Sequence, residues 1–208
     1  MKKITLLVIF ILSFSCNNAS KKNHGNSSIK KNAQILNTVV LPNYPLWSLN
    51  RLNLDKETTS YNRDAVFKIE RNSSFETAYA LVSNLAVSKG QKYRVSILVK
   101  QASVGGFFGL RIMGMYPNRI DAIFDLKNGI EKQVIEVGDF SKGSSLIESL
   151  GDGWYKCSLI GEVNVAKMKI ILGPTNGLRK TITWEAASDE KSNLKIIPAS
   201  LTLEELSK

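Results

Sequence analysis

The sequence has almost none of the histidine on which many catalytic centres depend. One of its 208 residues is a histidine, and this residue, His24, lies in a polar segment near the N-terminus. A Ser-His-Asp triad, a Cys-His pair and a His-ligated zinc ion each need a histidine within the folded part of a protein. The composition therefore excludes these three kinds of site there.

Cysteine is nearly as scarce, because the chain has only Cys16 and Cys157. If Cys16 is modified, Cys157 has no partner and no disulfide can form. Cys157 lies in a segment where apolar residues alternate with polar ones. That pattern favours a buried, inert thiol over a nucleophile.

The chain also has no apolar run long enough to span a bilayer, since its longest covers only residues 4–12. This run follows Lys2 and Lys3 and leads through the small-residue stretch 13–15 to Cys16, an order typical of a secretory signal. The cysteine resembles that of a bacterial lipoprotein signal, in which Cys16 becomes the lipidated first residue, although Ser13 stands where such signals usually have leucine. The alternative is an ordinary signal peptide cut nearby. We expect a protein of the bacterial cell envelope, anchored in the membrane through a lipid on Cys16.

Basic residues are concentrated at the start of the chain. Six lysines and no acidic residue lie in residues 1–34, which leaves 22 basic and 18 acidic side chains in residues 35–208. The later part has no basic block with interleaved aromatics, so nucleic acid is excluded as a partner. We expect a signal peptide over residues 1–15 and a disordered tether over 16–34, because the polar tether has little to bury. Its lysines either attract anionic head groups or form a solvated spacer.

Residues 35–208 are predicted to form one domain built from β-strands. Residues 93–100 alternate, with Tyr93 and Val95 on one face and Arg94 and Ser96 on the other. About ten such strands, separated by Gly, Pro and Asn turns, favour an all-β fold: an antiparallel two-sheet β-sandwich of jelly-roll type. A short helical turn is expected over 144–150, and Thr202 with Glu205 predicts a capping box at a terminal turn. The other predicted strands cover residues 47–54, 65–70, 77–83, 107–113, 120–126, 133–137, 154–160, 167–172 and 181–187.

Three stretches stand in an order seen in one kind of module: YRVSILVK at 93–100, FDLKNG at 124–129 and LGDGWYKCSL at 150–159. Together they resemble the jelly-roll modules of carbohydrate-binding type found in secreted glycan-degrading proteins and phage tail proteins. The last strand of such modules often reads Trp-Gly-Ala-Gln, whereas this chain has Trp184 followed by Glu185-Ala186-Ala187. The resemblance implies the fold. It implies no particular ligand, because this fold serves binders, lyases and structural proteins alike.

The candidate site residues are aromatic and basic. An aromatic ring covers the apolar face of a sugar, and a guanidinium binds carboxylate or sulfate. Trp47, near Tyr44, either presents an exposed ring or packs over the end of the sandwich. A basic stripe of Arg94, Lys100, Arg111, Lys156 and Lys169 forms if their strands share a sheet; the alternative is a solvated face with salt-bridge partners. The predicted ligand-binding residues are Trp47, Arg94, Lys100, Arg111, Tyr116, Arg119 and Lys156.

The function we expect is non-catalytic binding of a polysaccharide or other glycan, and the basic side chains favour an acidic one. The second hypothesis is a structural module that docks an envelope protein partner, and the third is a polysaccharide lyase or glycosidase. No catalytic residue is assigned, because no pair of carboxylates can be chosen from the sequence. We expect no cofactor. Structural calcium stays open, since Asp139 and Asp152 offer oxygen ligands but no loop is dense in carboxylates.

Overall fold

Strands make up most of the part of the chain that the structure describes. This computed structural model describes residues 33–177, 182, 184 and 191–207. No helix in this part is long and apolar enough to cross a membrane. The elements are β1 (Ile35–Val39), the 3-10 helix η1 (Tyr44–Leu46), β2 (Ser48–Asn50), β3 (Leu52–Tyr61), β4 (Asp64–Arg71), β5 (Tyr79–Ala86), β6 (Gln91–Gln101), β7 (Phe107–Met113), β8 (Arg119–Asp125), β9 (Ile130–Val137), β10 (Ser141–Gly151), β11 (Trp154–Val163), β12 (Lys167–Pro174) and β13 (Asn193–Leu206).

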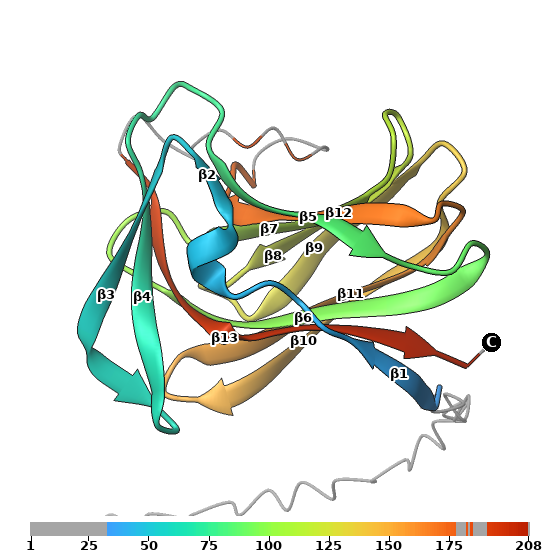
Figure 1. The fold of residues 1–208 in the computed structure, drawn as a ribbon. Coiled ribbons are helices and arrows are strands. Elements are labelled where there is room, and N and C mark those ends of the chain that lie inside the picture. Colours follow the sequence, from blue (N-terminus) through green and yellow to red (C-terminus); the bar gives the residue numbers. More distant parts are fainter. Residues whose placement is uncertain (1–32, 178–181, 183, 185–190, 208) are drawn as a thin grey trace, which may run out of the picture. The chain divides into compact units, whose positions relative to one another are not determined.

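The strands form two antiparallel sheets that lie face to face (Figure 1). The seven-stranded sheet has the order β10-β11-β6-β13-β4-β3, with β1 also paired to β13. The six-stranded sheet has the order β2-β5-β12-β7-β8-β9. This arrangement confirms the predicted all-β, two-sheet sandwich of jelly-roll type, with thirteen strands in the described residues instead of about ten.

The core lies between the sheets because alternate residues of the central strands point inward. Val95 and Ile97 of β6 and Leu110 and Ile112 of β7 are completely buried. The residues that alternate with them, Arg94 and Arg111 among them, therefore lie on the two outer faces. The outer faces are where a ligand has access to the sheets.

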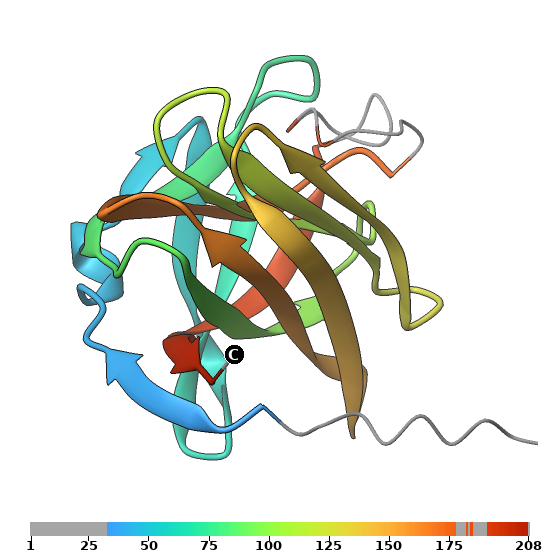
Figure 2. The same cartoon turned by 90° about the vertical axis from the view of Figure 1, so that its right-hand side faces the viewer.

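The chain passes from one sheet to the other at both sides of the sandwich. In Figure 2, β1 and η1 (blue) lie along one side and β9 and β10 (olive to gold) along the other. Arg51, with a φ of 48°, separates β2 in the six-stranded sheet from β3 in the seven-stranded sheet. The prediction of one strand over residues 47–54 is therefore wrong, because the backbone turns at Arg51.

Both predicted helical turns are also wrong. Residues 144–150 lie in β10, which pairs with β11 from Ser141 to Gly151. Thr202 and Glu205 lie in β13, which pairs with β6 on one side and with β4 and β1 on the other. In both places a neighbouring strand supplies hydrogen-bond partners along the whole segment, which a single helical turn does not. The strand predicted over 181–187 lies outside the described residues, apart from Ile182 and Trp184.

Candidate functional site

The β7–β8 hairpin brings two of the predicted ligand-binding arginines together. Arg111 pairs in register with Asp121, and Met113 pairs with Arg119. Residues two apart on a strand share a face, so all four side chains lie on the outer face of the six-stranded sheet. A tight turn fixes this register, because the Asn118 N–H donates to the Met115 carbonyl and the Gly114 N–H donates to the Asn118 carbonyl, each at 2.9 Å.

Two guanidinium groups share one buried carboxylate on this face. Arg111 donates from Nε to Asp121 Oδ1 at 2.5 Å and from Nη2 to Oδ2 at 2.8 Å. Arg119 donates from Nε to the same Oδ2 at 3.3 Å and from Nη1 to the Pro117 carbonyl at 3.3 Å. We call Arg111, Arg119 and Asp121 the arginine cluster. It carries one excess positive charge, and within the described residues Arg111 Nη1 and Arg119 Nη2 make no hydrogen bond.

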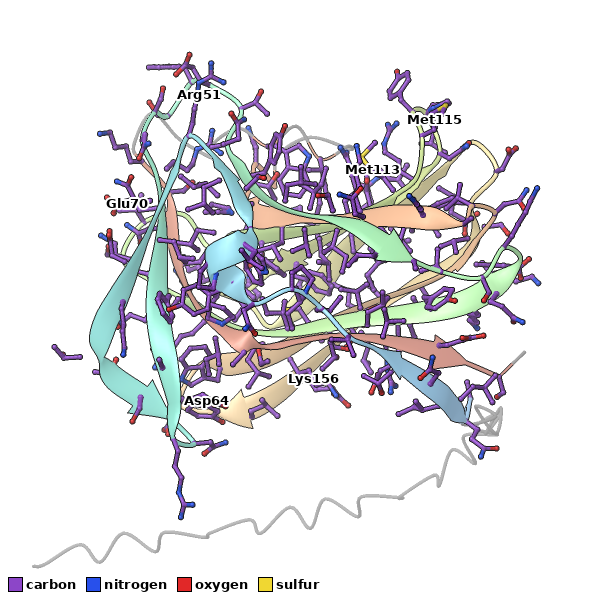
Figure 3. The ribbon with its side chains drawn as sticks, viewed as in Figure 1. Arg51, Asp64, Glu70, Met113, Met115 and Lys156 are labelled. Atoms are coloured by element: carbon purple, nitrogen blue, oxygen red, sulfur yellow. The ribbon has the colours of Figure 1, made fainter. Side chains whose placement is uncertain are left out.

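A third cation lies beside the arginine cluster on the next strand. Lys169 of β12 pairs with Met113, which pairs in turn with Arg119, so the three form one row across three strands. Neighbouring strands are about 4.8 Å apart, which places the backbones of Lys169 and Arg119 about 10 Å apart. Figure 3 shows Met113 on the outside of the six-stranded sheet, with Met115 in the loop beyond it. Among the described residues, Arg111, Arg119 and Lys169 thus set three cations around the one carboxylate of Asp121.

Trp184 packs on the same outer face, next to Arg111. Gly109 leaves room for it, since a Cβ there would lie 3.0 Å from the indole of Trp184. The Arg111 Cζ atom lies 5.4 Å from the centroid of this ring, within range of a cation–π interaction. Trp184 is only 4% exposed, and its buried Nε1 has no hydrogen-bond partner among the described residues. It therefore supports Arg111 and leaves little surface for a ligand.

Tyr116 supplies the exposed aromatic ring at this end of the sheet. It lies in the β7–β8 turn and is 79% exposed. An apolar pocket of about 410 Å³ lies nearby, lined among others by Met115, Val165, Lys167 and Lys169. Arg111, Arg119 and Tyr116 of the predicted site residues are thus gathered by one hairpin.

The structure separates the other predicted cations from this hairpin. Arg94, Lys100 and Lys156 lie on the outer face of the seven-stranded sheet, as their pairing along β6 and β11 shows. Figure 3 shows Lys156 on the side of the sandwich away from Met113. Arg94 is also paired with Glu204, at 2.7 Å. The five cations of the expected stripe therefore lie on two opposite faces.

Trp47 packs into the core instead of presenting its ring. It follows η1, is 6% exposed, and donates from Nε1 to the Pro42 carbonyl at 3.2 Å. Tyr44, at the start of η1, is 37% exposed, and its ring centroid lies 4.6 Å from the ring centroid of Phe67. Of this pair, Tyr44 is the side chain with an accessible surface.

Metal and thiol chemistry find little support in the described residues. These residues contain no group of three or more His, Cys, Asp or Glu side chains that could hold a metal ion. Cys157 is completely buried, which confirms the predicted burial, and burial raises the pKa of its thiol far above the ordinary value. A thiol with a raised pKa is a poor nucleophile.

No protein-family model matches this chain, and no curated protein matches it either. Among solved structures, the chain is similar to the CBM22-1 and GH10 modules of endo-1,4-β-D-xylanase 10B from Clostridium thermocellum, complexed with xylohexaose (13% identity, TM-score 0.46). That match covers 81% of this chain and 28% of the xylanase chain.

Two further structures are similar to the chain. One is the CBM22-1 xylan-binding domain of Xyn10C from Paenibacillus barcinonensis, at 12% identity and a TM-score of 0.45, covering 85% of this chain and 97% of that one. The other is a family 30 carbohydrate binding module, at 10% identity and a TM-score of 0.28, covering 76% and 93%. With TM-scores this low, none of these likenesses assigns a ligand or a residue role, so the site is defined by the chain's own side chains.

Asp121 is the main member of the site that the sequence analysis did not single out. The signal was present, because Arg111 and Asp121 lie at equal distances from Tyr116 in the sequence. A hairpin closed at residues 116–118 pairs these two positions on one face. The role of Trp184 had no such signal, since it reaches the hairpin from a distant part of the chain.

Proposed function

We propose that this protein binds an acidic carbohydrate, without catalysis, at the outer end of the β7–β8 hairpin. The arginine cluster is the observation that carries the proposal. Its shared carboxylate holds two guanidinium groups side by side with donor atoms to spare, and Lys169 adds charge in the same row. Guanidinium forks suit the planar carboxylates of uronic acids and the oxygens of sulfate esters. Tyr116 offers the ring face that a sugar needs.

Asp121 serves in this proposal as an anchor and not as a catalytic acid. It is 1% exposed, and both of its oxygens accept bonds from arginine. An acid or base needs contact with its substrate. The buried carboxylate instead fixes the two guanidinium groups in orientations that lower the entropic cost of binding.

The test is binding of the purified protein to polyuronates, sulfated glycans and neutral dextran at low and high salt. We expect retention on the anionic polymers that weakens with salt, because exposed charge interactions are screened. Arg119→Gln should lower the affinity about tenfold, or about 1.4 kcal/mol. Lys156→Gln is the control, since it removes one charge from the opposite face.

Equal loss of affinity in both variants would contradict the site, because a net-charge effect would then explain the binding. Retention on dextran alone would contradict the acidic ligand. A protein partner of an envelope complex becomes the better hypothesis if none of these polymers is retained.

We further propose that the protein is exported and anchored at the bacterial envelope through a lipid on Cys16. The order of basic residues, short apolar run and cysteine supports this. Metabolic labelling with an alkyne-bearing fatty acid tests it. The unmodified sequence should be labelled and found with membranes, while Cys16→Ala should carry no label. Label on the Cys16→Ala variant would rule out Cys16 as the lipidated residue.

A further inference from the structure

The strand β13 has two different neighbours along one side, with a gap between them. Residues 193–196 pair with β4, and residues 203–206 pair with β1, while β6 runs along the other side of β13. The register shifts between Ile197 and Thr202, where Pro198 has no N–H to donate. Ser200 fixes this irregular stretch, accepting from the Leu98 N–H at 2.8 Å and donating to the Ile197 carbonyl at 2.6 Å. The gap is therefore a built feature of the sheet.

The connection from β1 to β2 crosses this gap and turns it into a pocket. In Figure 1, η1 lies on this connection, between the levels of the two sheets. The resulting pocket has a volume of about 380 Å³. Buried Trp47 and Pro198 line its inner part, and the more exposed Tyr44, Thr38, Asn43 and Thr202 lie around them. This volume lies at the lower end of the range for small-ligand sites, about 300–1,000 Å³.

The lining combines a rigid aromatic ring with uncharged polar groups. Tyr44 is held by its contact with Phe67, so its ring loses little entropy when a ligand packs on it. Thr38 and Thr202 contribute hydroxyl groups. Asn43 precedes η1, yet its side chain makes no capping hydrogen bond and its amide stays available. None of the described residues that line this pocket is charged.

We propose that this pocket binds one uncharged pyranose ring of a glycan, at a site separate from the arginine cluster. Aromatic carbon packs on the C–H face of such a ring, and hydroxyl and amide groups bond its hydroxyls. A proline-rich peptide fits less well, because it needs several side-chain N–H donors for its carbonyls. Of the two such side chains in the described lining, Trp47 is already bonded to Pro42, which leaves only the Asn43 amide. The inference shares the ligand class of the proposed function but does not depend on the arginine cluster.

The test is isothermal titration calorimetry of the purified protein with neutral oligosaccharides: cello-, xylo-, manno- and malto-hexaose, each at low and high salt. We expect at least one to bind with an affinity that salt does not change, because the pocket has no charge to screen. Ala199→Trp, at an exposed position on the pocket, should fill it and lower that affinity at least tenfold. Tyr44→Ala should lower it similarly. Leu46→Ala is the matched control, because this 75% exposed residue of η1 does not line the pocket.

The outcomes separate the two sites. Unchanged binding in Ala199→Trp, or no binding of any of the four sugars, overturns the inference. Salt-insensitive binding of a polyproline decapeptide that Ala199→Trp abolishes, without sugar binding, also overturns it and makes the pocket a peptide site. Loss of neutral-sugar binding in Ala199→Trp with unchanged binding in Arg119→Gln supports it, even if no acidic glycan is retained and the proposed function fails.

Discussion

Arg111 donates two hydrogen bonds to the carboxylate of Asp121 on the outer face of the six-stranded sheet, from Nε at 2.5 Å and from Nη2 at 2.8 Å. The side chains of Arg111 and Asp121 are 13% and 1% exposed, so this pair is largely removed from water. Removing one member of a buried pair leaves the other charge without compensation. Arg111 is therefore a structural residue as well as a candidate binding residue.

We expect Arg111→Met to lower the free energy of unfolding by about 3 kcal/mol, measured by urea denaturation. Arg119→Gln should cost less than about 1 kcal/mol, because Arg119 approaches Asp121 only to 3.3 Å. Full stability of Arg111→Met would contradict the buried pair. The double variant Arg111→Met, Asp121→Leu should recover most of the loss, because it removes the buried carboxylate together with its closest partner. Arg119, the more exposed of the two arginines, then loses only a weak contact at 3.3 Å.

The contrast between β7 and β13 shows which parts of this fold the sequence can predict. β7 was predicted over residues 107–113, where the structure has it, because alternation and a nearby turn are local signals. β13 was not predicted, because it is recognised as a strand only by its pairing with β6, about a hundred residues earlier in the chain. The arginine cluster lies on one hairpin and was partly predictable. The pocket around Tyr44 and Trp47 depends on the irregular stretch of β13, so no local pattern could show it.

Arg71 holds the backbone at Trp184 in place, and its loss should destabilise the protein strongly. This arginine is completely buried, and it donates to the carbonyls of Trp184 at 2.5 Å, Ser73 at 3.2 Å and Pro174 at 3.4 Å. Arg71→Met removes these bonds, two of which lie at the buried Trp184 and Pro174 carbonyls, although the Trp184 carbonyl keeps its bond from the Ala78 N–H. We expect a loss of about 3 kcal/mol, seen in thermal unfolding as a Tm lower by roughly 6–12 °C.

Arg71→Lys is the informative companion variant, because lysine keeps the charge but cannot reach several carbonyls from one planar group. It should recover only part of the lost Tm. A Tm equal to that of the unmodified protein would mean that charge alone, and not the guanidinium geometry, stabilises this region.

Cys157 should resist alkylation as long as the protein is folded. Its side chain is completely buried between the sheets, and burial raises the pKa of the thiol, so thiolate is scarce at neutral pH. In a Cys16→Ser background, iodoacetamide should modify Cys157 only after denaturant is added, as intact-mass spectrometry will show. Rapid modification of the folded protein would place this thiol at the surface.

Glu57 should make the stability of the sandwich depend on acid pH. Lys195 Nζ donates to its carboxylate at 2.6 Å, and this bond, with a further one from Thr59, lowers the pKa of Glu57 below the ordinary 4.5. The unfolded chain therefore binds a proton at a higher pH than the folded protein does. The stabilisation is present above about pH 4.5 and is lost as the pH falls through the lower, folded-state pKa. Because both side chains are partly exposed, it amounts to less than about 1 kcal/mol.

Urea denaturation across this acid range measures the effect. Glu57→Gln and Lys195→Met should each flatten the fall in the free energy of unfolding with decreasing pH. The double variant should flatten it no further, because the two single variants remove the same interaction. Glu148→Gln, at an exposed position on β10, is the matched control and should leave the fall unchanged. An identical slope in Glu57→Gln and the unmodified protein would assign the acid sensitivity to other carboxylates. Glu70, whose pKa is lowered chiefly by its hydrogen bond with Lys68, would then be the next to test.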